Sequence, residues 1–310
     1  MVGLRPTCPA GSLALAPQGV AAAGASNGPK RWERAAPALD PVLGDIDFVG
    51  HCLLSVHMDL SGKVAMVTGG SGDIGQAICL ALAAAGCDVA ITYVGNSAGA
   101  EETAAAVAAT GRRAHQVQLD QRSEASIEAA VANVLAEFGG VDILVNNAAW
   151  NIGIPFKQLQ TLDGDTWDRV METNLRGPFL LSRALADALR AGDGGRIVNI
   201  ASVGGLNPGS SSIAYSCSKA GLIHLTHCLA VALAPEISVN CVAPGLVEGT
   251  RMARRLPDEV SAGARRQAVL GKVGSAEDIA DATVLLCRAD TITGQTIVVD
   301  GGMPGAMNFG

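Results

Sequence analysis

Short runs of β-branched and apolar residues alternate with longer alanine-rich stretches from Lys63 to the end of the chain. The runs expected to form strands are 64–69, 88–93, 113–120, 141–148, 195–202, 237–244 and 294–301. The stretches expected to form helices are 74–86, 98–110, 123–138, 165–190, 213–234 and 275–288. Strands separated by helices require crossover connections, which build a parallel sheet. The sequence therefore predicts an α/β, doubly wound parallel sheet of about seven strands with helices on both faces.

Residues 1–57 lack this alternation and are rich in Pro, Gly and Ala. They are open to three interpretations: a disordered segment, a targeting peptide, or a translated upstream stretch with Met58 as the natural start. We favour a dispensable, mostly disordered extension, followed by a single domain over residues 58–310.

Charge and cysteine spacing exclude several classes of protein. The formal net charge is −7, whereas a general nucleic-acid binder needs a basic surface. No apolar run reaches the roughly 18 residues that predict a membrane span. The eight cysteines are scattered and form no C-x-x-C pair, so we expect reduced thiols of a cytoplasmic protein and neither a disulfide nor a metal site.

A glycine-rich turn, TGGSGDIG, joins the first expected strand to the first expected helix at residues 68–75. Such a turn lets a pyrophosphate approach the backbone at the positive end of a helix. Asp120, the NNAA tetrapeptide from Asn146 and Ser202 end three later strands. Because parallel strands end at the same edge, these groups and the turn are expected to share one crevice.

Tyr215 and Lys219 are four residues apart on an expected helix, so they share one face. A phenol has a reference pKa of about 10, which a neighbouring ammonium lowers by stabilising the phenolate. Ser202 lies thirteen residues before Tyr215 and offers a hydroxyl to a substrate oxygen. The three residues indicate proton transfer at a carbonyl or alcohol.

These motifs, together with Asn174 in NLRG, the APG of residues 243–245 and the closing ITGQTIVVDGG, resemble the classical short-chain dehydrogenase/reductases. The resemblance covers 58–303 and is nearest to 3-oxoacyl-[acyl-carrier-protein] reductase-like members. It implies a Rossmann-type fold and an NAD(P)(H)-dependent oxidoreductase that interconverts an alcohol and a carbonyl by hydride transfer, with a 3-oxoacyl thioester among the candidate substrates.

The resemblance also implies roles for individual residues. Tyr215 would be the general acid/base, Ser202 would hold the substrate oxygen, Lys219 would lower the pKa of Tyr215 and bind the nicotinamide ribose, and Asn174 would position a relay water. The implied cofactor contacts are Gly69, Ser71, Ile74, Gly75, Tyr93, Asp120, Gln121, Asn147, Ala148, Tyr215, Lys219, Pro244, Gly245 and Val247.

The chain departs from the family pattern at three places. Asp73 replaces the middle glycine of the turn, NNAA replaces NNAG, and PGLVEGT carries an extra residue before Thr250. The negative charge of Asp73 is unfavourable near a pyrophosphate. A catalytically weak nucleotide-binding or structural member is therefore the alternative function, although an intact Asn174, Ser202, Tyr215 and Lys219 set argues against it.

The choice of cofactor depends on the end of the second strand. NAD-specific members carry an acid there for the ribose 2′-hydroxyl, whereas this chain has Tyr93 followed by VGNS. We therefore favour NADP(H). NAD(H) stays open because Gly72 occupies the turn position where a basic residue is often found.

Substrate and assembly are less constrained by the sequence. Trp150, Asn151 and residues 206–213 and 246–266 are expected to shape a pocket for a small alcohol or carbonyl substrate. The five arginines of 251–266 form either a lid for acidic thioesters or a solvated helix face. Val231 replaces an arginine that is usual in carrier-protein reductases, which argues against a docking surface for a carrier protein. By resemblance, helices 165–190 and 213–234 pair across a two-fold axis, which implies a homo-oligomer, either a tetramer or a dimer.

Overall fold

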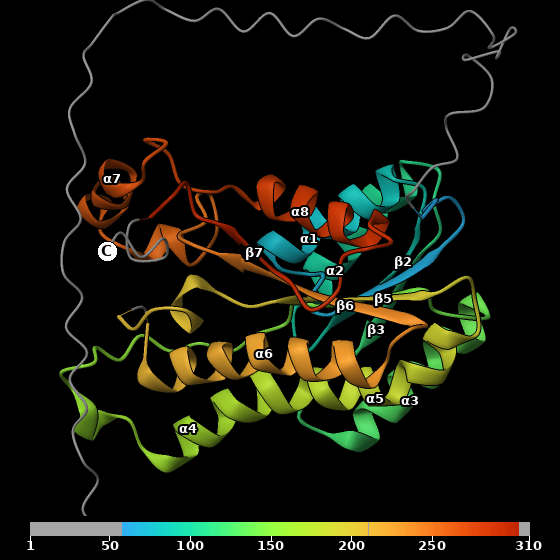
Figure 1. Ribbon diagram of the computed structural model, residues 1–310, viewed down its shortest axis with the longest axis horizontal. Helices are drawn as coiled ribbons and strands as arrows, with labels where there is room; N and C mark the ends of the chain where they lie inside the picture. Colours follow the sequence, from blue (N-terminus) through green and yellow to red (C-terminus); the bar gives the residue numbers. More distant parts are fainter. Residues whose placement is uncertain (1–57, 210, 304–310) are drawn as a thin grey trace, which may run out of the picture. The chain divides into compact units, whose positions relative to one another are not determined.

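Every strand of the described chain belongs to one parallel sheet, with helices on both of its faces (Figure 1). The computed structural model describes residues 58–209 and 211–303. In that part of the chain the strands are β1 Val64–Val67, β2 Asp88–Tyr93, β3 Ala114–Gln118, β4 Ile143–Asn146, β5 Gly195–Ile200, β6 Ile237–Pro244 and β7 Thr296–Val299. The predicted doubly wound α/β fold with seven strands is confirmed.

The helices of the same residues connect successive strands along the chain. They are α1 Asp73–Ala84, α2 Ser97–Ala108, α3 Glu124–Phe138, α4 Gly164–Met171, α5 Gly177–Arg190, α6 Ile213–Ala232, α7 Asp258–Gln267 and α8 Ala276–Arg288. Short turns of other helix types are η1 Leu159–Thr161, η2 Glu172–Arg176, η3 Val203–Gly205 and η4 Ala253–Arg255. No helix of the described residues is long and apolar enough to cross a membrane.

The strand order β3-β2-β1-β4-β5-β6-β7 reverses direction between β1 and β4. From β1 the chain winds outward through β2 and β3, and then returns through α3 to start β4 on the other side of β1. The connections after β1 and β4 consequently leave the sheet in opposite directions. This opens a crevice at the carboxyl ends of the two strands, which is where doubly wound folds bind their ligands.

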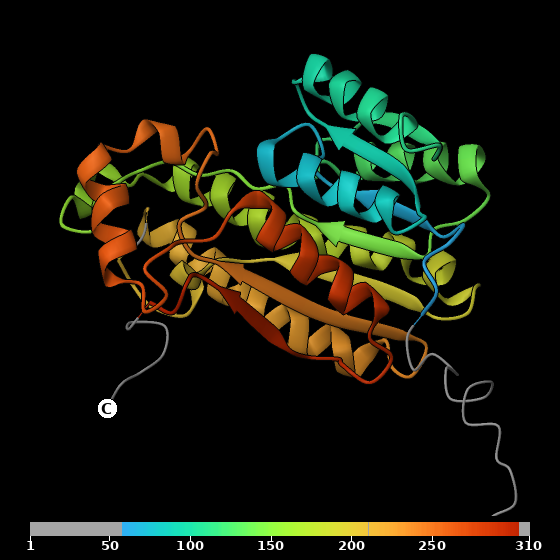
Figure 2. The same ribbon diagram turned by 90° about the horizontal axis from the view of Figure 1, so that it is seen from above.

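Alternate residues of each buried strand serve opposite layers of the core. Val67 of β1 packs with Ile78 of α1 in one apolar cluster, whereas Met66 packs with Leu181 of α5 in another. Figure 1 and Figure 2 show α1, α2 and α8 on one face of the sheet and α3, α5 and α6 on the other. Because both faces are covered, each strand needs apolar residues in both directions, which explains the near-continuous apolar runs of the sequence.

The helix predicted over 165–190 is not uniform. A π-helical turn, η2, separates α4 from α5 and contains Asn174. A π turn inserts an extra residue into a helix, which rotates the side chains around it and is common at functional sites. The apolar period of the sequence continues through the turn, so it gives no sign of the insertion.

Helix α7 was not among the predicted helices, although a solvated helix face was one of the two interpretations of residues 251–266. None of its residues is buried, in keeping with that interpretation. It lies in the segment that follows β6, at the end of the sheet where the strands terminate (Figure 2).

The predicted extension of residues 1–57 lies outside the described residues. The described chain begins at Met58, whose backbone N–H donates to the carbonyl of Arg288 at the end of α8. Leu60 is already buried in the core. Packing of the α/β unit thus starts within three residues of the predicted boundary.

Candidate active site

The glycine-rich turn between β1 and α1 is built so tightly that two of its glycines cannot be replaced. Gly69 has a φ of +65°, a conformation that other residues rarely adopt. A Cβ on Gly75 would lie 2.2 Å from the carbonyl oxygen of Gly69. The turn therefore presents bare backbone toward the crevice, as close approach by a phosphate requires.

Thr68 and Asn147 join the turn to the tip of β4. The Thr68 hydroxyl accepts the backbone N–H groups of Asn147 and Ala148, both at 2.9 Å. The Asn147 amide donates to the carbonyls of Thr68 at 2.9 Å and Gly69 at 3.3 Å. The side chain of Asn147, expected at the adenosine ribose, is thus engaged in bracing the glycine turn.

Residues of β2 and α2 brace the turn from the other side. The Asn96 amide donates to the Ser71 carbonyl at 2.8 Å, and the Thr103 hydroxyl donates to the Gly70 carbonyl at 3.0 Å. The Thr92 hydroxyl accepts the Gly69 N–H at 3.3 Å. Sequence reasoning missed these three positioning residues, because a polar residue near a strand end, at a helix cap or inside a helix is usually explained by a local hydrogen bond, as the Thr103 hydroxyl also makes to the Gly99 carbonyl.

The N-terminal end of α1 has the properties that a dinucleotide pyrophosphate requires. Its N-cap residue, Gly72, has no side chain to satisfy the first N–H groups of the helix. Uncapped N–H groups and the helix dipole together favour an anion. Gly69, Ser71, Ile74 and Gly75 all lie in this turn or in the first helical residues, as expected. Tyr93 ends β2, half-buried, and its backbone carbonyl accepts the Leu119 N–H at 2.8 Å.

Asp120 and Gln121, expected at the adenine, follow β3. Two hydrogen bonds from the Arg122 guanidinium hold the pKa of the Asp120 carboxyl below its usual range. Gln121 is buried, and its amide donates to the carbonyls of Ala148 and Thr173 at 3.1 and 2.6 Å. Its Oε1 is buried without a partner, so one polar group here remains available for a ligand.

Ser202 and Tyr215 meet beyond the end of β5. Ser202 caps the η3 turn by accepting the Gly204 N–H at 3.1 Å, and its hydroxyl lies close enough to the phenol to lower the pKa of Tyr215. Tyr215 is in the first turn of α6, where the side chain of Ser212 caps the helix by accepting the Tyr215 N–H at 3.2 Å. Two hydroxyls from distant segments are thus positioned side by side.

Lys219 lies one helical turn beyond Tyr215 and is only 2% exposed. Its ammonium donates to the Ile200 carbonyl at 2.8 Å and lies 5.7 Å from the centre of the Tyr215 ring. Burial disfavours the charged form and lowers the pKa of Lys219 to about 8. The residue that is expected to act electrostatically is therefore itself easily deprotonated.

The pKa of Tyr215 differs from the expectation. Burial of the phenol raises its pKa, and the hydrogen bond from Ser202 acts in the opposite direction. The Lys219 ammonium, which donates to the Ile200 carbonyl, does not reverse this direction. In the protein alone, the predicted lowering by Lys219 is therefore wrong, and Tyr215 is held in its protonated form.

Asn174 of η2 is completely buried and fixes the loop after β4. Its Oδ1 accepts the Trp150 N–H at 2.8 Å, and its Nδ2 donates to the Trp150 carbonyl at 3.0 Å and to the Ser218 hydroxyl at 3.1 Å. The Trp150 ring in turn stacks on the Arg169 guanidinium at 4.2 Å. The side chain of Asn174 thus connects the predicted pocket residue Trp150 to α6.

A buried polar chain beneath the site was also missed. The Asn146 amide donates to the Asn199 side chain at 2.8 Å, and Asn199 donates to the Thr226 hydroxyl at 2.9 Å. These bonds connect β4, β5 and α6 in order. Their signal in the sequence is an asparagine that follows two or three consecutive apolar residues in each of two strands, where an unpaired amide would be costly. This row of hydrogen bonds positions α6, and with it Tyr215 and Lys219, against the strand ends.

The segment after β6 supplies the remaining predicted contacts. Pro244 ends β6, and a Cβ on Gly245 would lie 2.6 Å from the Cβ of Asp300, so the two segments touch. Val247 pairs with Gly274 in an isolated parallel bridge. Thr250 is 7% exposed, and its hydroxyl donates to the Val247 carbonyl at 2.8 Å. The extra residue of PGLVEGT thus leaves the Thr250 hydroxyl occupied within its own turn.

Three comparisons identify the relatives of the chain. A family model described as Enoyl-(Acyl carrier protein) reductase matches residues 70–304. The 3-oxoacyl-[acyl-carrier-protein] reductase of Aquifex aeolicus is 40% identical over 254 residues, which cover 80% of this chain and all of that protein. The chain belongs to the short-chain dehydrogenase/reductase family.

Solved structures agree with this assignment. A short-chain dehydrogenase from Burkholderia cenocepacia in complex with NADP has a TM-score of 0.73 at 36% identity, covering 79% of this chain and 99% of that one. An NAD+-bound xylitol dehydrogenase has a TM-score of 0.75 at 29% identity, covering 79% of this chain and all of that one. The chain is an NAD(P)(H)-dependent oxidoreductase that acts on CH–OH groups.

Replacing Tyr215 with Phe should lower turnover by about 10²- to 10⁴-fold while the cofactor Kd stays within twofold, because only the transferable proton is removed. Stopped-flow rates and nicotinamide fluorescence measure the two quantities. Cys217→Ser, at an exposed position of the same helix, is the matched control and should behave as the parent. Equal turnover of Tyr215→Phe and the parent would contradict the role of the phenol.

Replacing Lys219 with Met should abolish turnover and raise the melting temperature at pH 7. Because the pKa of buried Lys219 is lowered to about 8 from its usual 10.5, the folded parent binds this proton less tightly than the unfolded chain does. The parent therefore gains stability as pH rises from about 8 to 10.5, and its melting temperature should approach that of Lys219→Met. A difference that stays constant across this window would show that Lys219 is not a buried charge.

Proposed function

We propose that the protein reduces the keto group of a 3-oxoacyl thioester with NADPH in the cytoplasm. The observation that carries the proposal is the group of half-buried Ser202, half-buried Tyr215 and buried Lys219 beside a glycine turn braced for a dinucleotide. Relatives described as 3-oxoacyl-[acyl-carrier-protein] reductases, 40% identical over their whole length, support the substrate class. Free buried thiols such as Cys79 and Cys287 are in keeping with a reducing compartment.

The side chains divide the reaction between them. The nicotinamide supplies a hydride to the keto carbon when the cofactor is bound. Ser202 donates a hydrogen bond to the keto oxygen, and Tyr215 transfers its phenolic proton to the same oxygen as the alcohol forms. Burial keeps Tyr215 protonated, which is the form that a general acid needs. Lys219 binds the nicotinamide ribose, and Asn174 holds the loop that borders the substrate.

The preference for NADPH rests on the end of β2. Tyr93 and the residues up to Ser97 include no acid to bind a ribose 2′-hydroxyl. Asn96, the polar residue nearest to the glycine turn on this side, donates to the Ser71 carbonyl and carries no charge to repel a 2′-phosphate.

We propose that the carrier of the acyl group contributes little to the reaction rate. Val231 is 83% exposed on α6, at the position where the resemblance implies a carrier-protein arginine. We therefore propose that coenzyme A and carrier-protein thioesters react at comparable rates.

Initial rates of NADPH oxidation with acetoacetyl-coenzyme A and acetoacetyl-carrier protein test the proposal. We expect turnover of both thioesters, at least tenfold less with NADH, and no oxidation of xylitol with NAD+. Inactivity toward thioesters together with reduction of NAD+ by xylitol would replace the proposal with polyol oxidation, as the similarity to xylitol dehydrogenase would then indicate. Tyr215→Phe is the blank for each reaction.

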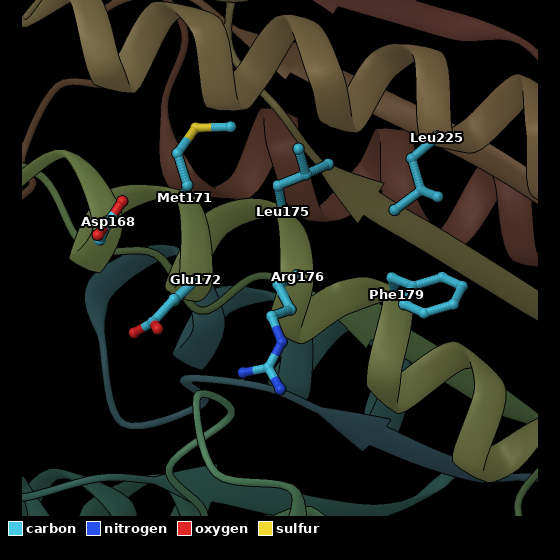
Figure 3. A pocket seen from close by; sticks show the side chains of 7 residues that line it. All are labelled: Asp168, Met171, Glu172, Leu175, Arg176, Phe179 and Leu225. Atoms are coloured by element: carbon cyan, nitrogen blue, oxygen red, sulfur yellow. The ribbon is translucent and has the colours of Figure 1, made fainter.

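We also propose a homotetramer in which α4, α5 and α6 pair across a two-fold axis. An open hollow crosses these helices and is lined by Asp168, Met171, Glu172, Leu175, Arg176, Phe179 and Leu225. Figure 3 shows Met171 and Leu175 pointing toward the side of α6, with Phe179 next to Leu225 and the charged side chains along the opposite border. Phe179 is 41% exposed, which gives an apolar surface that a second copy would cover.

Most leucines of α5 and α6 do not support this pairing. Leu180, Leu181, Leu185, Leu222 and Leu229 are buried within the single chain. The two helices turn these leucines toward the sheet and toward each other, and only Leu225 stays half-exposed. The support comes instead from Phe179 and Val231, which are exposed on α5 and α6.

Phe179→Asp should reduce the assembly, because a charge in the centre of an apolar interface is costly to bury. Light scattering should give four times the 31.4 kDa chain mass for the parent and at most half of that for the variant. Leu159→Asp, at a residue of η1 that is 56% exposed, is the control and should keep the mass of the parent. A parent mass of one chain at micromolar concentration would rule out the tetramer.

A further inference from the structure

Asp73, the residue that departs from the family pattern in the glycine turn, is paired with the segment that follows β6. Its Oδ2 accepts the backbone N–H of Arg251 at 2.7 Å and lies 3.5 Å from Nε of the same residue. Its Oδ1 lies 3.7 Å from Nη2 of Arg254. Segments 178 residues apart in the sequence are thus joined at the start of α1.

The pairing reverses the sign of the charge at the turn. One carboxylate faces two guanidinium groups, so the cluster of Asp73, Arg251 and Arg254 carries a net positive charge. The Arg251 guanidinium also lies over the turn itself, since a Cβ on Gly72 would be 3.5 Å from its Nη2. The Arg251 guanidinium therefore lies beside Gly72, the turn position where a basic residue is often found in the family.

The segment that supplies this cation has few other attachments. Residues of η4 and α7 are all at least partly exposed. Thr250 anchors the start of the segment, and an ion pair between Glu248 and Arg265 ties α7 back to the loop after β6. The Asp73 cluster is the tie between this segment and the nucleotide turn, so it determines how closely Arg251 approaches the turn.

We propose that Arg251 binds the pyrophosphate of the dinucleotide and that Asp73 is the positioning residue that holds it there. The uncapped N–H groups of α1 would contact the anion from one side and the guanidinium from the other. The proposal rests on the use of a dinucleotide in the proposed function. It assigns the site to the pyrophosphate, which NADH and NADPH share, and not to the 2′-phosphate.

The competing interpretation predicts the opposite change in cofactor affinity. If Asp73 acts on the cofactor directly, its negative charge repels the pyrophosphate, and Asp73→Asn should tighten binding. If Asp73 acts through Arg251, the same substitution releases the guanidinium and should weaken binding. One isosteric variant therefore separates the two interpretations.

Dissociation constants from nicotinamide fluorescence test the assignment. Arg251→Gln should weaken NADH and NADPH equally, by about tenfold or more, as expected for the loss of a charge-assisted hydrogen bond. ADP, which carries a pyrophosphate without nicotinamide, should weaken likewise in calorimetry, whereas adenosine should be unaffected. A loss confined to NADPH would overturn the pyrophosphate assignment, as would unchanged binding of all the ligands.

A double-mutant cycle tests the positioning role. Asp73→Asn should weaken both dinucleotides about threefold, and in the Arg251→Gln background it should have no further effect, because the two residues act as one unit. Arg255→Gln, an exposed arginine of the same η4 turn, is the matched control and should bind as the parent. Additive losses, or tighter binding by Asp73→Asn, would contradict the positioning role.

A readout without cofactor completes the test. In the free protein, Asp73→Asn should speed trypsin cleavage after Arg254 and Arg255, because it releases the segment from the turn, while the melting temperature stays within about 2 °C. Unchanged cleavage would contradict the tie. If the parent binds neither dinucleotide, the proposed function fails; if the parent binds and Arg251→Gln binds equally well, only the present inference fails.

Discussion

The Thr68 hydroxyl is the point on which the geometry of the site depends. It accepts two backbone N–H groups from the tip of β4 while the Asn147 amide returns to the turn after β1. These bonds link the ends of β1 and β4, the two strands between which the winding direction of the sheet reverses. They extend the pairing of β1 and β4, which covers three residue pairs and the Thr68 N–H to Val145 carbonyl bond, to the glycine turn itself. The position of α1, and therefore of any bound phosphate, follows from this contact.

The fold was predictable from the sequence because its signals are local and repeated. Both limits of β2 and β6 coincide with their predicted ranges, and the Ser202, Tyr215 and Lys219 group lies together as the spacing indicates. The π turn at Asn174 was not predictable, because a π turn changes the hydrogen bonding without changing the apolar period. Helix α7 was anticipated only as a solvated helix face within 251–266, because it buries no side chain and its exact limits leave no apolar signal.

The bracing of the site was also beyond sequence reasoning, for a different reason. In the sequence, Asp73 is an unfavourable negative charge in the glycine turn. In the fold, Arg251 and Arg254 lie beside it and compensate that charge. Pairings of this kind depend on the path of the chain after β6, and no spacing rule connects residues so far apart. The same holds for Asn146, Asn199 and Thr226, which read singly as polar interruptions and together form one buried chain. Sequence motifs identified the reacting groups, whereas the supporting groups required the fold.

Burial has opposite effects on the two ionisable groups at the centre of the site, and this bears on the direction of the reaction. It raises the pKa of Tyr215 and lowers that of Lys219 to about 8. Near pH 7 the phenol therefore keeps its proton, while the ammonium retains its charge with little margin. A protonated phenol donates to the oxygen formed when a ketone is reduced, but it must first lose its proton to act as a base toward an alcohol. In the free protein, burial thus keeps the phenol of Tyr215 in the form that a general acid needs.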